Sequence, residues 1–357
     1  MASSLFEKAA ARICFFGDHQ DYLGLPVIAA TIDRYIYMEA TPIDEPMLHI
    51  DLLDEGKSEK ITLQESDKSL AARDYFRSAI RVLAREGIEL TQGYSVKVWG
   101  DIPIQAGLSS SSALVVAWIR LLLKMAVPHR QFSPEKIAHW SYTAEVLEFN
   151  EPGGLMDQYT IALGGLLYID TRSGNYQRLE AVWDSIVVVD SGIEKNTLHM
   201  LATAKSSALE ALALVKEKQP GFQLEKATPA DYERTVNELP KQLQPYWYAA
   251  LHNHHITQNA LAELKSPTTD LSRIAHWMNA HQRILQNDIK NTPEAMIDLM
   301  QLALEHGAKG MKIVGSGGGG CFVVLTTKAK EKQLLNALKK AEVKEVFPVN
   351  ITSPSHA

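Results

Sequence analysis

The chain has 357 residues, of which 46% are hydrophobic and 22% are charged, and its formal net charge is −6. This length suggests two domains or one large one, and the composition is that of a soluble globular protein with ample material for a core. The negative net charge and the lack of a long run of basic residues argue against nucleic acid or an anionic membrane as the main partner.

The start of the chain, Met1 to Lys8, lacks the basic region and apolar core of a signal peptide. No uninterrupted apolar run approaches the ~18 residues of a membrane-spanning helix. The two cysteines, Cys14 and Cys321, are flanked by apolar residues, so we expect buried, reduced thiols. Together these features predict a cytoplasmic protein.

Residues 11–17 predict a strand, and residues 18–24 after it read Asp-His-Gln-Asp-Tyr-Leu-Gly. This segment gathers two carboxylates, an imidazole and a phenol, where an ordinary loop would use more Ser, Asn, Gly or Pro. Loops between buried strands commonly hold ligands. Residues 27–38 are again strand-like, with a turn expected at Asp33 and Arg34.

Residues 42–68 predict a strand pair with a charged connection, and residues 70–86 predict an amphipathic helix. Gly56-Lys57-Ser58 resembles the end of a phosphate-binding P-loop. The glycine that this motif requires five residues before Gly56 is missing, so a P-loop is excluded there.

Residues 107–113 read Gly-Leu-Ser-Ser-Ser-Ser-Ala and lie between a predicted strand, residues 94–99, and an apolar run, residues 114–124, that predicts a buried helix. A helix start has unpaired N–H groups and partial positive charge, so it attracts anions. Gly107 lets a ligand approach the backbone closely. One serine would suffice as an N-cap. Four serines after a glycine favour a polyphosphate site over a cap.

Ser133-Pro134-Glu135 marks the start of a helix that we expect to end near Glu148. The Pro-Gly-Gly sequence that follows, at residues 152–154, lets the chain turn sharply before a short helix. Asp157 lies at or near the start of that helix. Taken alone, Asp157 is best explained as a charge that complements the helix dipole.

Strands are predicted at residues 166–170 and 186–190, and we place a domain boundary between them, at residue 180. The second half of the chain is mainly helical. Three histidines within it, His252, His254 and His255, match no zinc-binding signature. The predicted helices span residues 196–218, 228–242, 246–264, 271–286 and 294–306.

A run of glycines at residues 315–320 lies between two apolar segments, residues 311–314 and 321–325. The glycines satisfy the spacing G-x-G-x-x-G, but a dinucleotide-binding fold would require a helix directly afterwards. A second apolar segment follows instead. We therefore expect a glycine hairpin whose bare backbone approaches another segment or a ligand.

Several of these segments, in their order, resemble the motifs of the GHMP small-molecule kinases, which include galactokinase, homoserine kinase and mevalonate kinase. The central motif matches from Pro103 to Ala113, and the C-terminal glycine motif matches at residues 315–320. Residues 32–37, 153–159 and 310–320 also resemble the bacterial heptose-phosphate kinases. Two further motifs resemble galactokinase in particular, on Arg12, Gly17, Asp18, His19, Asp21 and Tyr22, and on Pro152, Gly154, Met156, Asp157 and Gln158.

The resemblance implies an α+β fold of two domains with the active site between them. Residues 1–180 would form a domain like the second domain of ribosomal protein S5, and residues 181–357 a ferredoxin-like domain. ATP would be the co-substrate, with Mg²⁺, and a small-molecule sugar the other substrate. No nucleic acid or membrane partner is implied, and the chain would act as a monomer or homodimer.

The resemblance also implies a role for each candidate residue. Asp157 would accept the proton of the sugar hydroxyl, while Arg12 would keep Asp157 ionised and offset charge on the phosphoryl group. Mg²⁺ would bind Ser111 and Glu145. The ATP phosphates would bind Gly107, Leu108, Ser109, Ser110, Ser111, Ser112 and Ala113. The sugar would bind Asp18, His19, Asp21, Tyr22 and Gly154, and the C-terminal glycine motif would contribute Gly315, Gly317, Gly318 and Gly319.

The implied reaction is phosphorylation of a monosaccharide at its anomeric hydroxyl. Galactokinases have Glu where this chain has Asp18, so the sugar itself stays open. One alternative is a kinase of a sugar phosphate, which needs an added basic pocket. Another is a galactokinase-like sensor that binds sugar and ATP without turnover, although the intact residues 109–112 and Asp157 favour catalysis. Mevalonate-type kinases are disfavoured, because residues 18–22 suit a polyol.

Overall fold

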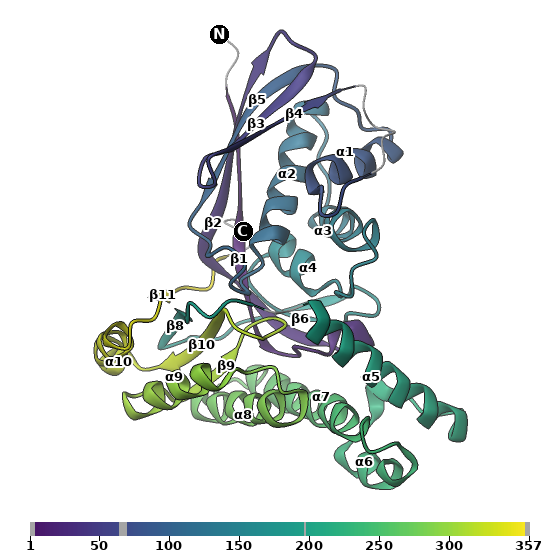
Figure 1. Cartoon of the computed structure of the whole chain (residues 1–357), viewed down its shortest axis with the longest axis vertical. Helices are drawn as coiled ribbons and strands as arrows, with labels where there is room; N and C mark the ends of the chain where they lie inside the picture. Colours follow the sequence, from purple (N-terminus) through teal and green to yellow (C-terminus); the bar gives the residue numbers. More distant parts are fainter. Residues whose placement is uncertain (1–3, 64–69, 196–197, 354–357) are drawn as a thin grey trace.

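The computed structural model describes residues 4–63, 70–195 and 198–353. The strands within these ranges form two sheets, which occupy the upper and lower halves of Figure 1. The first sheet has the order β4-β3-β5-β2-β6-β7, with β1 paired to β2, and the second has the order β11-β8-β10-β9. With helices packed on both sheets, the fold is α+β, as predicted.

The bounds of the strands follow the apolar and alternating segments of the sequence. The first sheet contains β1 (Leu5–Phe16), β2 (Val27–Ile43), β3 (Met47–Leu52), β4 (Lys57–Thr62), β5 (Gly93–Gly100), β6 (Leu166–Ile169) and β7 (Tyr176–Leu179). The second contains β8 (Ser185–Asp190), β9 (Gly310–Ile313), β10 (Cys321–Thr326) and β11 (Glu345–Val349). The short, half-polar strands β7 and β11 were not predicted. Cys14 and Cys321 are buried and free, as predicted.

β2 runs without a break through Asp33 and Arg34, so the turn predicted there is wrong. The register of β1 against β2 shifts between Ala10 and Ala11, which pair with Tyr35 and Ile32. Asp33 and Arg34 are therefore the extra residues of a β-bulge. Their side chains reach the C-terminal segment, where Asp33 accepts hydrogen bonds from Asn350 and Arg34 lies over the ring of Phe347.

Four helices cover one face of the first sheet: α1 (Tyr75–Arg85), α2 (Ser110–Ala126), α3 (Pro134–Tyr142) and α4 (Met156–Leu163) (Figure 1). α2 is apolar on nearly all sides, and it is buried between the strands β1 and β2 and the other three helices. The helix predicted to run from residue 133 to Glu148 is regular only to Tyr142. It continues as one π-helical turn over Thr143–Leu147.

The lower half contains α5 (Leu198–Lys218), α6 (Pro229–Thr235), α7 (Gln244–Leu264), α8 (Leu271–Ile284), α9 (Glu294–Glu305) and α10 (Lys328–Lys340). Residues 196–197 of the first predicted helix lie outside the described residues. The helix predicted over 228–242 ends at Thr235, because Pro240 lacks an N–H donor and holds Leu239 extended. Within the described residues, no helix has the length and apolar character needed to cross a membrane.

The segment between β1 and β2, Gly17–Leu25, lies where the two halves meet. The amide of Gln20 is buried and bonds to α7, donating to the carbonyl of Ala250 and accepting from Thr257. Leu23 and Leu25 pack in a separate apolar cluster with residues of α5 and α7, among them Trp247. The lower half therefore fixes the position of this polar segment.

Candidate active site

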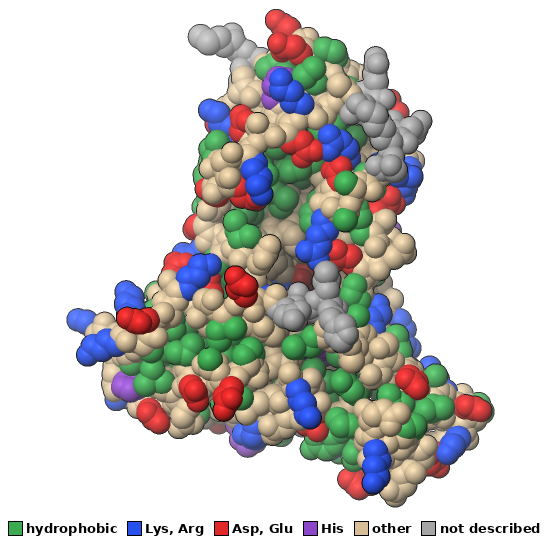
Figure 2. Space-filling model, viewed as in Figure 1, with side chains coloured by type: hydrophobic (Ala, Val, Ile, Leu, Met, Phe, Trp, Pro, Cys, Tyr) green, Lys and Arg blue, Asp and Glu red, His purple; other side chains and the backbone are tan. Residues whose placement is uncertain are grey.

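A cavity of about 750 Å³ lies at the junction of the two halves and extends up beside the first sheet. Figure 2 shows this face hollowed between the strands and the helices of the upper half, with hydrophobic side chains at its floor. This volume is in the range of small-molecule binding sites. The cavity is lined by residues from the segment 18–22, the serine loop, the starts of α2 and α4, and the glycine hairpin.

The serine loop forms the middle of the cavity wall, and Ser109, Ser110, Ser111 and Ser112 all line it. Ser109 stands at the N-cap position of α2 but has a left-handed backbone, φ 59°, and makes no capping hydrogen bond. Its hydroxyl donates instead to Asp157 Oδ2, at 2.5 Å. The first N–H groups of α2 are thus not satisfied by a side-chain cap. This geometry supports the anion-site interpretation of the loop over a simple cap.

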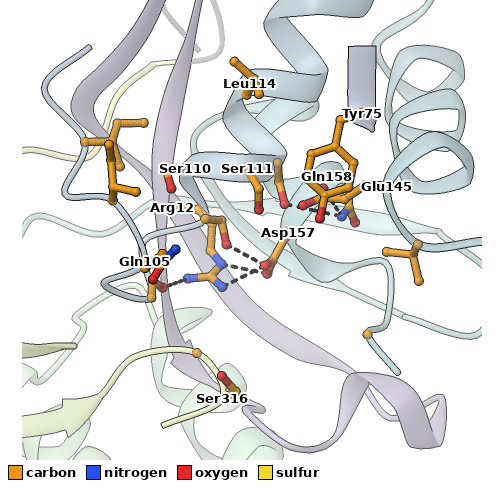
Figure 3. A pocket seen from close by; sticks show the side chains of 18 of the residues that line it. Arg12, Tyr75, Gln105, Ser110, Ser111, Leu114, Glu145, Asp157, Gln158 and Ser316 are labelled. Atoms are coloured by element: carbon orange, nitrogen blue, oxygen red, sulfur yellow. Dashed lines mark hydrogen bonds and ion pairs between the residues drawn. The ribbon is translucent and has the colours of Figure 1, made fainter. Parts of the chain in front are cut away.

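Arg12 and Asp157 meet at the base of the serine loop (Figure 3). The guanidinium forms two parallel hydrogen bonds to the carboxylate, Nε to Oδ1 at 2.7 Å and Nη2 to Oδ2 at 2.9 Å. Its third nitrogen, Nη1, donates to the carbonyl of Gly107 at 2.6 Å. Such a bidentate pair fixes the orientation of both groups. One arginine of β1 therefore joins the start of the serine loop to the start of α4.

The charge state of Asp157 follows from these contacts. Burial by itself would raise the pKa of Asp157, but the charge and hydrogen bonds of Arg12, with the hydroxyl of Ser109, hold this pKa below its ordinary value. The carboxylate is ionised at neutral pH. Its side chain is 27% exposed, compared with 4% for that of Arg12, so Asp157 is the partner that faces the cavity.

Glu145 lies on the other side of the serine loop, in the π-helical turn after α3. The carboxylate accepts from Gln158 Nε2 at 2.6 Å and also interacts with the hydroxyls of Ser111 and Ser112. Burial raises the pKa of Glu145, and these hydrogen bonds oppose the rise. The π turn separates Glu145 from Glu148, which pairs with Arg85 on the surface.

Asp21 lies at the lower end of the cavity, close to Asp157. Its Oδ1 accepts from the backbone N–H of Tyr22 at 2.9 Å. Burial, together with the negative charge of Asp157, raises the pKa of Asp21 to about 7. Gly154 lies against this carboxylate, and a Cβ at that position would stand 2.4 Å from Asp21 Oδ2. The glycine is needed there because no side chain fits.

His19 and Asp18 are engaged mainly with the glycine hairpin. His19 Nε2 lies 2.9 Å from the carbonyl of Ser316 and Nδ1 lies 3.2 Å from the hydroxyl of Tyr22, which places the proton on Nε2. Asp18 Oδ1 accepts from the N–H of Gly315 at 3.0 Å, and Oδ2 pairs with Lys312. Both groups therefore have protein partners before any substrate binds.

The glycine hairpin follows the strand–loop–strand pattern predicted for it, between β9 and β10. Gly315 and Ser316 line the cavity, whereas Gly317, Gly318 and Gly319 do not. Gly318 N–H donates to the carbonyl of Asn291, and a Cβ on Gly319 would stand 2.6 Å from the carbonyl of Ile193. These glycines pack against other parts of the chain.

The upper end of the cavity has an apolar character. Two aromatic residues, Tyr75 and Trp99, line it together with apolar side chains and a few charged ones. Such a surface suits a flat, uncharged ring. The apolar residues are Ile36, Leu52, Val98, Ile102 and Leu114, and the charged ones are Asp54, Glu55 and Arg73.

Comparisons with known proteins agree with this arrangement. The model of the GHMP kinases N terminal domain matches residues 74–165, and that of the GHMP kinases C terminal domain matches residues 260–344. The chain belongs to the GHMP kinase family. The first of these matches contains the serine loop, Glu145 and Asp157, and the second contains the glycine hairpin.

Curated GHMP kinases with different acceptors resemble the chain to similar degrees. It is 27% identical to the mevalonate kinase of Thermococcus sibiricus over 345 residues, which cover 94% of this chain and 92% of the relative. It is 25% identical to the galactokinase of Pyrococcus furiosus over 344 residues, covering 94% and 93%. The crystal structure of Lactococcus lactis galactokinase complexed with galactose has the same fold, with a TM-score of 0.85, 19% identity and coverage of 98% and 94%.

Some cavity residues were given no role from the sequence. Gln158 belongs to the motif of Asp157, but its contact with Glu145 depends on the π turn. Tyr75 and Trp99 belong to segments whose patterns indicate only a helix and a strand. Lys195 is a single lysine after a strand, and nothing in its sequence neighbourhood marks it.

Proposed function

We propose that this GHMP kinase transfers the γ-phosphoryl group of ATP to a hydroxyl group of a monosaccharide, at the anomeric carbon. The observation that carries the proposal is the continuity of the cavity. A single space joins an apolar, aromatic end that suits adenine, the uncapped start of α2 that suits phosphates, and a carboxylate-lined end that suits hydroxyl groups.

The proposed step requires few groups. The acceptor oxygen attacks the γ-phosphorus, the bond from that phosphorus to the bridging oxygen of ADP breaks, and the hydroxyl proton passes to Asp157. Because Arg12 keeps the pKa of Asp157 low, this carboxylate is a weak base and takes the proton as the new bond to phosphorus forms. Arg12 also neutralises charge on the moving group.

The residues around Glu145 fit a magnesium ion. The Ser111 hydroxyl and the Glu145 carboxylate are hard oxygen ligands beside the phosphate loop, and Mg²⁺ needs few protein ligands. The described residues contain no cluster of three or more His, Cys, Asp or Glu side chains that could bind a metal by themselves. When bound, the ion would neutralise charge on the ATP phosphates.

Replacing Glu145 tests this assignment. We expect Glu145→Gln to raise the Mg²⁺ concentration needed for half-maximal activity by at least tenfold, while Glu148→Gln, which changes a nearby surface carboxylate, leaves it unchanged. The measurement is a magnesium titration of turnover at saturating ATP. An unaltered titration of Glu145→Gln would remove this residue from the metal site.

The acceptor end favours a neutral polyol. None of the described residues donates a hydrogen bond to Asp21 Oδ2, so this oxygen can accept from a substrate hydroxyl. Each hydroxyl of a sugar needs its own partner, and a carboxylate in the acceptor would meet both Asp21 and Asp157. Mevalonate carries such a carboxylate. It stays the second candidate because relatives named mevalonate kinase match nearly the whole chain.

A coupled assay of ADP release tests the proposal. The panel should contain galactose, fucose, arabinose, glucuronate, mannose, a heptose 7-phosphate and mevalonate, each with and without ATP. We expect release above the acceptor-free rate with at least one unphosphorylated sugar. Release with mevalonate or the sugar phosphate alone would reject the proposal, and release with none of them would point to a sensor.

A further inference from the structure

We propose that Lys195 is a further catalytic residue, which binds the transferred phosphoryl group at the start of the serine loop. The inference uses the kinase activity of the family and does not depend on which acceptor the enzyme takes. It rests on the position of Lys195, on the rigidity of its segment and on its lack of a partner.

The lysine is held at the phosphate loop by the glycine hairpin. It ends the segment Ser191–Lys195, which follows β8. Gly320 N–H donates to the carbonyl of Ile193 at 2.9 Å, and the N–H and hydroxyl of Ser191 both donate to the carbonyl of Gly320. Gly319 abuts the carbonyl of Glu194 so closely that no Cβ fits. The backbone from residue 191 to residue 194, which leads to Lys195, is therefore held against the hairpin.

The amine of Lys195 lies at the first residue of the serine loop. A Cβ on Gly107 would stand 2.9 Å from Lys195 Nζ. Arg12 reaches the same residue and donates to the carbonyl of Gly107. Both side chains line the cavity. Two cations, one from each half of the fold, thus lie at the start of the phosphate loop.

The amine of Lys195 has no close counter-charge. Among residues 4–63, 70–195 and 198–353 it forms no hydrogen bond or ion pair, and Asp157 and Asp18 act on its charge only over a longer distance. Arg12, in contrast, pairs with Asp157, and Lys312 pairs with Asp18. A half-buried amine without a partner is unfavourable unless a ligand supplies the negative charge. A phosphoryl group carries that charge and three acceptor oxygens.

The surroundings of Lys195 also make the proposal testable by pH. Burial lowers its pKa to about 8, and the charge of Arg12 contributes, while Cys321, Asp157 and Asp18 oppose the shift. The amine of the free enzyme therefore loses its proton as pH rises through about 8. Activity that depends on this charge falls over the same range, and an arginine there would stay charged.

The experiment compares Lys195→Met and Lys195→Arg with wild type, and uses Lys241→Met, at an exposed lysine, as control. We expect Lys195→Met to bind the β,γ-imido analogue of ATP at least tenfold more weakly in calorimetry while ADP affinity stays within twofold. Its kcat should fall about 100-fold. Lys195→Arg should keep most of the affinity for the imido analogue and most of kcat. It should also move the alkaline limb of the kcat/KM profile to higher pH.

Two results would overturn the proposal. One is that Lys195→Met loses the same affinity for the imido analogue as for ADP, or loses none for either. The other is a rise in the KM of the acceptor with kcat unchanged, which would assign Lys195 to the acceptor. The calorimetric arm uses nucleotides alone, so it stands even if no sugar is phosphorylated. A melting temperature near that of wild type excludes misfolding of the methionine variant.

Discussion

At Asp157, a bidentate ion pair and a serine hydroxyl hold both carboxylate oxygens. The same contacts lower its pKa, so the residue is ionised in the free enzyme, as the proposed proton acceptor must be. Asp21, in the same cavity, has the opposite environment. It is buried beside a second carboxylate and forms no ion pair with any of the described residues.

Asp157→Asn keeps the shape of the side chain and removes its charge. We expect kcat to fall by about 10²–10⁴, the usual contribution of a general base, with affinity for nucleotide within a few-fold of wild type. Steady-state kinetics and nucleotide titration measure both. A variant that folds normally and turns over at the wild-type rate would show that Asp157 takes no proton.

Asp21 should make stability depend on pH. Its pKa in the folded chain is about 7, above the ordinary value of 3.8, because of burial and of Asp157. Between these values the folded state holds a proton that the unfolded state has lost, so stability falls as pH rises from about 4 to about 7.

The isosteric variant Asp21→Asn lacks this dependence. We expect it to melt a few degrees above wild type at pH 8 and close to wild type at pH 4, as followed by calorimetry over this range. The expected difference therefore grows with pH. A constant difference between the two proteins at all pH values would contradict the assignment of this titration to Asp21.

At the scale of elements, the turn before α4 places Asp157 and leaves room for Asp21. It contains two adjacent glycines with different surroundings. A Cβ on Gly153 would have its nearest neighbour at 3.8 Å, on Val146, whereas a Cβ on Gly154 would stand 2.4 Å from Asp21 Oδ2. The two positions form a matched pair for substitution.

Gly154→Ala should displace the Asp21 carboxylate and raise the KM of the acceptor by tenfold or more, with a smaller effect on the KM of ATP. Gly153→Ala should behave as wild type in the same assays. The comparison separates the loss of space at Asp21 from the general effect of a stiffer turn. Equal effects of both substitutions would mean that Gly154 has no specific role at the acceptor end.

Sequence patterns identified the elements more readily than their local irregularities. The buried helix after the serines, the glycine hairpin and most helices of the second half follow from periodicity and end signals. The bulge at Asp33 and the π turn at Glu145 depend on tertiary packing, whereas the break before Pro240 is a local effect of the proline that the helix prediction did not take into account. The candidate site residues were predicted mainly from the family resemblance. No pattern of spacing predicts that Arg12 contacts Asp157, which lies 145 positions later in the chain. The partners of Asp18 and Lys195 required the three-dimensional structure.

At the scale of the whole molecule, the two halves are joined by a fully buried ion pair. Lys312 of β9 reaches Asp18, which follows β1, and both side chains are almost inaccessible to water. The same Asp18 also accepts from the backbone of the glycine hairpin. This pair holds the polar segment 18–22 against the lower half, on which the shape of the acceptor end depends.

Breaking this pair should be costly. Lys312→Met leaves the Asp18 carboxylate buried without its cation, and we expect it to lower the free energy of unfolding by about 3–5 kcal/mol. The double variant Asp18→Asn with Lys312→Met should recover part of this loss, because no charge is then stranded. Denaturant unfolding of the two single variants and the double variant measures the coupling. Additive losses would show that the two residues do not stabilise each other.

The most direct test of the account is the product of the reaction, followed by ³¹P NMR with ATP, Mg²⁺ and the best unphosphorylated sugar of the panel. The account predicts a new sugar-phosphate resonance that grows as ADP forms and is split into a doublet by the single hydrogen on the anomeric carbon. A phosphate resonance split by two hydrogens would place the transfer at a CH₂OH group. Inorganic phosphate as the sole new resonance apart from those of ADP would show that no sugar is the acceptor.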